Sequence, residues 1–112
     1  MDNNQTIQKD KDLLIKTFRE LETRHELADF LEDLLTEDEF TDFSQRIKIA
    51  KSILEGKTYE EIAQKVDAST ATISKVGKAI KYGKGAFQKL FAKEEKRWVL
   101  WTRILIWQLY SF

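Results

Sequence analysis

The chain has 112 residues, 42% hydrophobic and 34% charged, which suits one small domain with a modest core, and we expect no second domain. It contains no cysteine, which excludes disulfides and thiolate metal sites, and residues 1–12 lack the apolar run of a secretory signal. We therefore expect a cytoplasmic protein. Small helical domains often complete their core with a second copy, so a homodimer is also expected.

The charges cancel in number but are unevenly distributed. Nineteen basic residues balance nineteen acidic ones, yet residues 1–43 carry a net charge of −8 and the remainder carries +8. Six lysines and no acidic residue lie between Ala68 and Lys93. A concentrated cationic region of this kind is typical of a surface that binds a polyanion.

The first part of the chain predicts two helices. Proline and strand signals are absent, so we expect an all-α fold. Residues 1–10 form a polar stretch that we expect to be a mobile arm, and a helix is predicted over about 11–23. A second helix is predicted over about 25–35, with a buried stripe composed of Leu27, Phe30, Leu31, Leu34 and Leu35.

A third helix is predicted over about 37–55. Thr36 and Glu39 have the spacing of a capping box, and Gly56 follows where a helix can end in a left-handed conformation. Its apolar residues form a narrow seam that could serve either the core of one chain or a partner helix: Phe40, Phe43, Ile47, Ala50 and Leu54.

Residues 59–81 have the pattern of a helix-turn-helix. Thr58 and Glu61 form a second capping box, and Ser69 is a good N-cap for a following helix that runs through Ile80. Asp67 stands in the turn where a glycine is usual, and we expect it to tolerate a positive φ. The packing positions fit the motif, although a purely structural helical hairpin would share them: Ile62, Ala63, Val66, Ala68, Ile73 and Val76.

The other face of this motif is rich in hydroxyl groups and lysines. Short donors at a helix N-terminus can reach bases or phosphates in a major groove, and lysines attract phosphates. An ordinary solvated lysine face is the alternative. The pattern predicts a sequence-specific regulator of transcription, of the repressor type, that binds double-stranded DNA through Thr58, Ser69, Thr70, Thr72, Ser74, Lys75, Lys78 and Lys81.

Residues 27–92 resemble the Trp repressor family, in particular its YerC/YecD-like branch. The resemblance rests on Leu34-Leu35-Thr36-Glu37-Asp38-Glu39, Gln45-Arg46-Ile47-Lys48-Ile49, Leu54-Glu55-Gly56-Lys57-Thr58-Tyr59 and Ala68-Ser69-Thr70-Ala71-Thr72-Ile73-Ser74-Lys75. It implies an all-helical bundle that forms an interwound homodimer. The two helix-turn-helix units of this dimer would lie about one helical turn of DNA apart.

The resemblance also implies where a small-molecule effector would bind. Thr36 and Arg46 match ligand-contacting positions of the family, although for Arg46 an ion-pairing role on a helix surface is favoured over a ligand role. Lys75, Val76 and Ala79 stand where the family has an arginine, a glycine and a serine around the ligand. These three departures argue against tryptophan as the effector.

Residues 98–112 form an apolar extension beyond a domain predicted over 11–97. The extension holds all three tryptophans, but it is too short and too polar for a membrane span. We expect it to pack on the dimer or on another partner, with contact to a membrane surface as the less favoured alternative. The alternative function is therefore a helical protein-interaction module that works through this aromatic tail.

No pattern of residues indicates catalysis. His25 lies between Arg24 and Glu26 on a predicted surface helix, and there is no cysteine nucleophile or phosphate-binding glycine loop. The acidic cluster at the start of the third helix is explained by the helix dipole. We expect no catalytic residue, no cofactor and no metal site, and thus not an enzyme.

Overall fold

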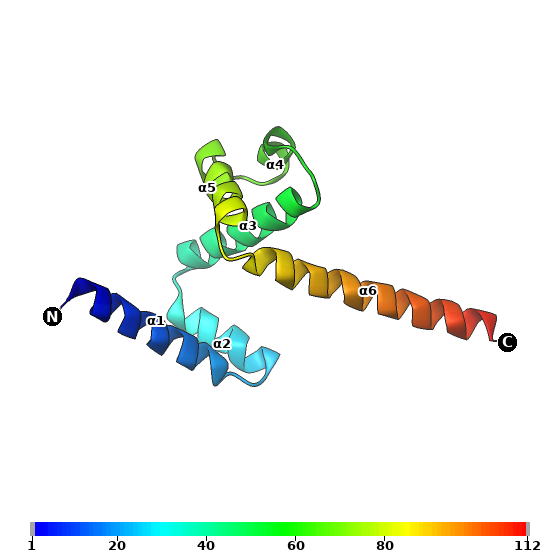
Figure 1. Ribbon diagram of the computed structural model, residues 1–112, viewed down its shortest axis with the longest axis horizontal. Helices are drawn as coiled ribbons and strands as arrows, with labels where there is room; N and C mark the ends of the chain where they lie inside the picture. Colours follow the sequence, from blue (N-terminus) through cyan, green and yellow to red (C-terminus); the bar gives the residue numbers. More distant parts are fainter. Residues whose placement is uncertain (1, 112) are drawn as a thin grey trace. The chain divides into compact units, whose positions relative to one another are not determined.

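The computed structural model describes residues 2–111, so Met1 of the expected arm and Phe112 of the expected extension lie outside the described residues. Across this range the chain is all-α (Figure 1). It divides into two units, residues 1–41 and 42–112, which are described separately. The helices are α1 (Asn3–Arg19), α2 (Arg24–Leu34), α3 (Glu37–Leu54), α4 (Tyr59–Lys65), α5 (Thr70–Tyr82) and α6 (Ala86–Tyr110).

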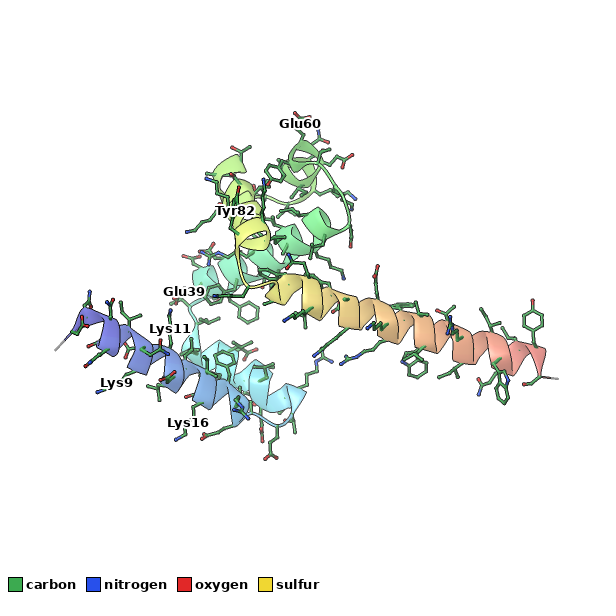
Figure 2. All side chains as sticks on the ribbon, viewed as in Figure 1. Lys9, Lys11, Lys16, Glu39, Glu60 and Tyr82 are labelled. Atoms are coloured by element: carbon green, nitrogen blue, oxygen red, sulfur yellow. The ribbon has the colours of Figure 1, made fainter. Side chains whose placement is uncertain are left out.

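The helix α1 begins earlier than the sequence predicted. We expected its start at about residue 11, after a polar arm, and this start is wrong because the helix begins at Asn3. The side chain of Asp2 accepts a hydrogen bond from the Asn4 backbone N–H at 3.3 Å, and no glycine or proline follows to interrupt the helix. Figure 2 shows Lys9 and Lys16 standing out along α1.

The helix α2 matches its predicted range to within one residue, and Thr23 caps it by accepting from the Glu26 N–H at 3.1 Å. The rings of Phe18 and Phe30 meet edge to face, with centroids 5.5 Å apart. No described residue of α1 or α2 is buried, and Leu34 is 48% exposed. The predicted buried stripe of α2 is therefore wrong for a single chain, because two helices alone cannot enclose it.

The capping box at the start of α3 is confirmed. The Glu39 carboxylate accepts from the Thr36 backbone N–H at 3.1 Å, and the Thr36 hydroxyl accepts from the Glu39 N–H at 3.2 Å. The hydrogen bond from the Thr36 backbone lowers the pKa of Glu39, and the Thr36 side chain adds to this effect. The box is therefore stronger while this carboxyl group is ionised.

This lowered pKa predicts a specific acid sensitivity. Because the folded pKa lies below the ordinary value of 4.5, the stabilisation by Glu39 is complete above that pH and is lost as the pH falls through the folded pKa. We expect a Glu39→Gln variant to lose less stability than the parent chain between about pH 5 and pH 3 in urea unfolding. Glu37→Gln is the matched control, and equal acid sensitivity of all three chains would contradict the role of the box.

The core of the second unit joins α3 to the helix pair α4 and α5. Its buried residues are Ile49 and Ala50 from α3, Ile62 from α4, and Ile73 and Val76 from α5. Of the seam predicted on α3, only Ala50 is buried, whereas Ile47 is 51% exposed. The helix therefore has two apolar faces, and the face centred on Ile49 is the one that packs within the chain.

The first turns of α6 lie against this core, and the rest of the helix continues beyond it (Figure 1). Gly85 has a φ of 75° and allows the chain to turn into α6, where Phe87 and Phe91 stack with ring centroids 6.3 Å apart. The helix then passes without a break through the boundary expected at residue 97. Of the helices described, none is both long and apolar enough to cross a bilayer.

Candidate nucleic-acid interface

The helix pair α4 and α5 has the predicted helix-turn-helix form. Thr58 and Glu61 make a complete capping box, with hydrogen bonds of 3.0 and 3.2 Å. Ser69 caps α5 by accepting from the Thr72 N–H at 3.2 Å. Ile62, Ile73 and Val76 are buried between the helices, as predicted, and Ala63, Val66 and Ala68 pack against them partly buried.

The turn between the two helices is closed without a left-handed residue. The positive φ that we expected Asp67 to tolerate is absent, since the only described residues with positive φ are Gly56 and Gly85. Instead the Ala68 N–H donates to the Val66 carbonyl at 2.7 Å, which makes a tight three-residue turn around Asp67. An inverse turn of this type has negative φ, so no glycine is required there.

Gln45 fixes this turn to α3, a role that sequence reasoning missed. Its Nε2 donates to the Asp67 carbonyl oxygen at 2.8 Å, across 22 positions of the sequence. The bond satisfies a carbonyl that the turn leaves free and holds the start of α5 relative to α3. Nothing in the sequence marks one glutamine on a helix as the partner of a distant turn.

Gly77 allows Tyr59 to pack close to α5. Gly77 is buried, and a Cβ atom there would overlap the Tyr59 hydroxyl and press on the ring carbon that bears it. Tyr59 is the first residue of α4, so this contact sets how closely the two helices approach. The sequence analysis also missed this pair, because a glycine inside a helix does not reveal which side chain occupies the space beside it.

A double-mutant cycle tests this contact. In a Tyr59→Ala background we expect Gly77→Ala to stabilise the chain by up to about 1 kcal/mol, because alanine is the better helix former. With Tyr59 present, the same change should instead lower the free energy of unfolding, since the ring must move. Urea unfolding of the four chains gives the coupling, and an equal gain in both backgrounds would show that the ring does not need this space.

The surface of α5 opposite the core forms one exposed stripe. Residues four, three and four positions apart share a helix face, and Ala71, Lys75, Lys78 and Tyr82 have this spacing and are all exposed. Figure 2 shows Tyr82 near the end of α5, and its ring lies 5.3 Å from the Lys81 ammonium. Ala71 and Tyr82 therefore join the face that was predicted from hydroxyls and lysines alone.

The other predicted residues lie around this stripe, with one exception. Thr70 and Lys81 are exposed, whereas Thr72 and Ser74 are half-buried. The hydroxyls of Ser69 and Thr72 are 3.0 Å apart, so the two share a hydrogen bond at the N-terminus of α5. Thr58 caps α4 instead, so the structure does not place it on the α5 face.

The α5 face carries positive charge without neutralisation. Among the ion pairs of residues 2–111, none involves Lys75, Lys78 or Lys81. The charges near α4 are mixed: the side chain of Lys57 and its positive charge lower the pKa of Lys65, but Lys57 also forms an ion pair of 3.7 Å with Glu55. The unpaired positive charge is therefore on α5.

The two predicted effector positions have structural roles of their own. Thr36 belongs to the first unit, where its hydroxyl caps α3. Arg46 belongs to the second unit, where its guanidinium lies 5.7 Å from the centre of the Phe43 ring. The surface ion pair considered for Arg46 is therefore replaced by a cation–π contact, and a role in effector binding stays a prediction for both residues.

This architecture also occurs in known proteins. The chain matches the Trp repressor protein family over residues 9–95. It is 36% identical over 80 residues to an uncharacterized protein of Bacillus subtilis, YerC, an alignment that covers 71% of this chain and 77% of YerC.

Two solved structures are also similar to this chain. A TrpR-like protein from Eubacterium eligens has a TM-score of 0.74 at 35% identity, covering 83% of this chain and 96% of its own. A Staphylococcus aureus protein, provisionally described as a Trp repressor, has a TM-score of 0.72 at 37% identity, covering 78% and 87%.

The fold and the exposed α5 face define an all-α protein with a helix-turn-helix. The chain belongs to the Trp repressor family, as its sequence predicted. Proteins of this family are regulators rather than enzymes, so the chain is not an enzyme. Residues 96–112 lie outside the family match.

Proposed function

We propose that this protein is a regulator of transcription, of the repressor type, that binds specific sites in double-stranded DNA through α5. The observation that carries the proposal is the exposed stripe of α5, which lies opposite the buried residues Ile73 and Val76 and bears lysines free of ion pairs. Membership of the Trp repressor family supports it.

The mechanism follows from the positions of the groups along α5. The N-terminal hydroxyls, with the positive end of the helix dipole, would face base edges and phosphates in the major groove. Ala71 is small enough to let the helix approach and offers a methyl group to a thymine methyl. Lys75 and Lys78, further along, would contact phosphates and fix the position of the helix without reading sequence.

The proposed active form is a homodimer. Apolar side chains of α2 and of the α3 seam remain exposed, including Leu34 at 48% and Ile47 at 51%. Both residues lie on amphipathic helices, whose apolar faces are usually covered. A second copy would cover these surfaces, as the family resemblance implies. Two α5 helices would then read half-sites about one helical turn apart.

Salt dependence tests the interface directly. We expect duplex affinity, measured by fluorescence anisotropy, to fall steeply with salt. In the proposed dimer each of Lys75→Ala and Lys78→Ala removes two phosphate contacts, one per copy, and should reduce the slope of log affinity against log salt by about 1.8. Lys16→Ala, an exposed lysine of α1, is the matched control and should leave the slope unchanged.

Two results would contradict the proposal. One is a slope that is the same in the parent chain and in both α5 variants, because the lysines would then touch no phosphate. The other is the absence of any complex with duplex DNA in dilute buffer, where the electrostatic contribution is largest.

A further inference from the structure

The C-terminal half of α6 exposes an unusual amount of apolar surface. Trp98, Trp101, Trp107 and Tyr110 are 75%, 65%, 71% and 85% exposed. Aromatic side chains bury about 150–250 Å² each, so these four offer on the order of 500 Å² before any aliphatic residue is counted. A stable interface takes about 800 Å² from each partner, so this segment has the surface of an interface.

One face of α6 continues a packing surface that the chain already uses. Phe87 and Phe91 pack on the core, and Trp98, Trp101 and Leu105 follow on the same side of the helix. Beside them is an open groove of about 570 Å³, lined by Lys51 of α3 and by Glu94, Arg97, Trp98, Trp101 and Leu105 of α6. Two of these lining residues, Lys51 and Glu94, form an ion pair of 3.8 Å.

The polar residues of the segment do not form a face. Between residues 98 and 110 they are Thr102, Arg103 and Gln108, whose spacings of one and five place them on three different sides of the helix. Figure 2 shows side chains standing out on both sides of this part of the ribbon. A helix lying on a lipid surface needs one continuous polar side, which this segment lacks. A helix that is apolar on nearly all sides is instead enclosed by protein.

Charge favours a second copy of the chain as the enclosing protein. Residues 96–111 contain Lys96, Arg97 and Arg103 and no acidic residue. Residues 20–42 contain ten acidic residues and one arginine, and the helix α2 among them also exposes leucines. A second copy therefore offers an apolar surface of opposite charge, and this surface is always present at the same concentration as the segment itself.

We propose that residues 98–110 are a self-association surface that binds a second copy of this chain, with Trp98, Trp101 and Leu105 at its centre. The segment lies outside residues 9–95 that match the family, so it adds an interface to any that the family fold supplies. The proposal extends the homodimer of the proposed function but does not depend on DNA binding.

Tryptophan fluorescence of the full chain tests this proposal without any substitution. All three tryptophans lie in the segment, so the emission reports on it alone. We expect blue-shifted emission at micromolar concentration and a red shift on dilution, over the same range in which sedimentation shows the assembly dissociating. Emission typical of water-exposed tryptophan while the protein is associated would overturn the proposal.

Variants locate the surface. A chain with Trp98→Ala, Trp101→Ala and Leu105→Ala should have a dissociation constant for self-association raised by at least about tenfold, since it loses the central contacts. The control is Lys89→Ala with Lys93→Ala, which changes two exposed residues of α6 outside the segment and should leave association unchanged. If the triple variant loses helical circular dichroism, Trp101→Ala alone replaces it.

Two outcomes would overturn the assignment and leave the proposed DNA binding untouched. The triple variant could associate as tightly as the parent chain. Alternatively, the blue shift could require phosphatidylglycerol vesicles and be independent of protein concentration, which would make lipid the partner. Failure of the DNA proposal would show instead in the Lys75 and Lys78 variants, in which this segment is unchanged.

Discussion

Ile73→Ala is expected to lower the free energy of unfolding by about 2–5 kcal/mol, the usual cost of truncating a buried aliphatic side chain. Ile73 has no exposed surface and lies where α3, α4 and α5 meet, with Ile49 and Ile62 as its large buried neighbours. Because whole domains are stable by only about 5–15 kcal/mol, this one change removes a large share of the total.

Urea unfolding followed by circular dichroism measures this loss. Tyr82→Ala is the control on the same helix, because Tyr82 is 75% exposed and its truncation should change stability by only about 0.5 kcal/mol. A cost at Ile73 as small as that at Tyr82 would mean that the three helices do not share one core.

Ala71→Glu is expected to weaken duplex binding by at least about a hundredfold, because a carboxylate would then stand between α5 and the DNA phosphates. The position is exposed on α5, and glutamate is a good helix former, so the fold should be kept. This prediction depends on the structure, since Ala71 was not among the residues predicted to contact DNA.

Fluorescence anisotropy with one labelled duplex measures the effect. Ala71→Gln has nearly the same size without the charge, and it should bind more tightly than Ala71→Glu by at least about tenfold if charge is the cause. Equal affinity of Ala71→Glu and the parent chain would exclude this face of α5 from the interface.

The sequence predicted the elements whose signals are local. Thr58 with Glu61, and Thr36 with Glu39, lie three residues apart, so each capping box could be recognised without tertiary information and each is confirmed. The spacing of Ile62, Ile73 and Val76 likewise predicted the packing of α4 on α5. The recognition of the family followed from the same local stretches.

Features that depend on distant or missing partners were predicted less well. The bond from Gln45 to the turn at Asp67 joins residues 22 positions apart, and the φ of Asp67 depends on how that turn closes. Periodicity showed that Ile47 is on an apolar seam, but it could not show that Ile49 faces the core of the same chain. An amphipathic pattern says that a face will be covered, and it does not say by which chain.

The start of α1 shows a different limit. Residues 3–10 are polar apart from Ile7 and lack an apolar stripe, so periodicity gave no reason to extend the helix through them. They nevertheless contain no helix breaker, and Asp2 supplies a cap. A capped run of ordinary helix formers can continue a helix without burying anything.

The most direct test of the central claim is a titration of the ¹⁵N-labelled protein with duplex DNA, followed by amide chemical shifts. We expect the largest changes to cluster at residues 69–82, on the cap and exposed stripe of α5, with smaller changes around α4. Changes confined to α1, α2 or the C-terminal half of α6, or no change at any duplex concentration, would contradict the assignment of α5 as the surface that binds DNA.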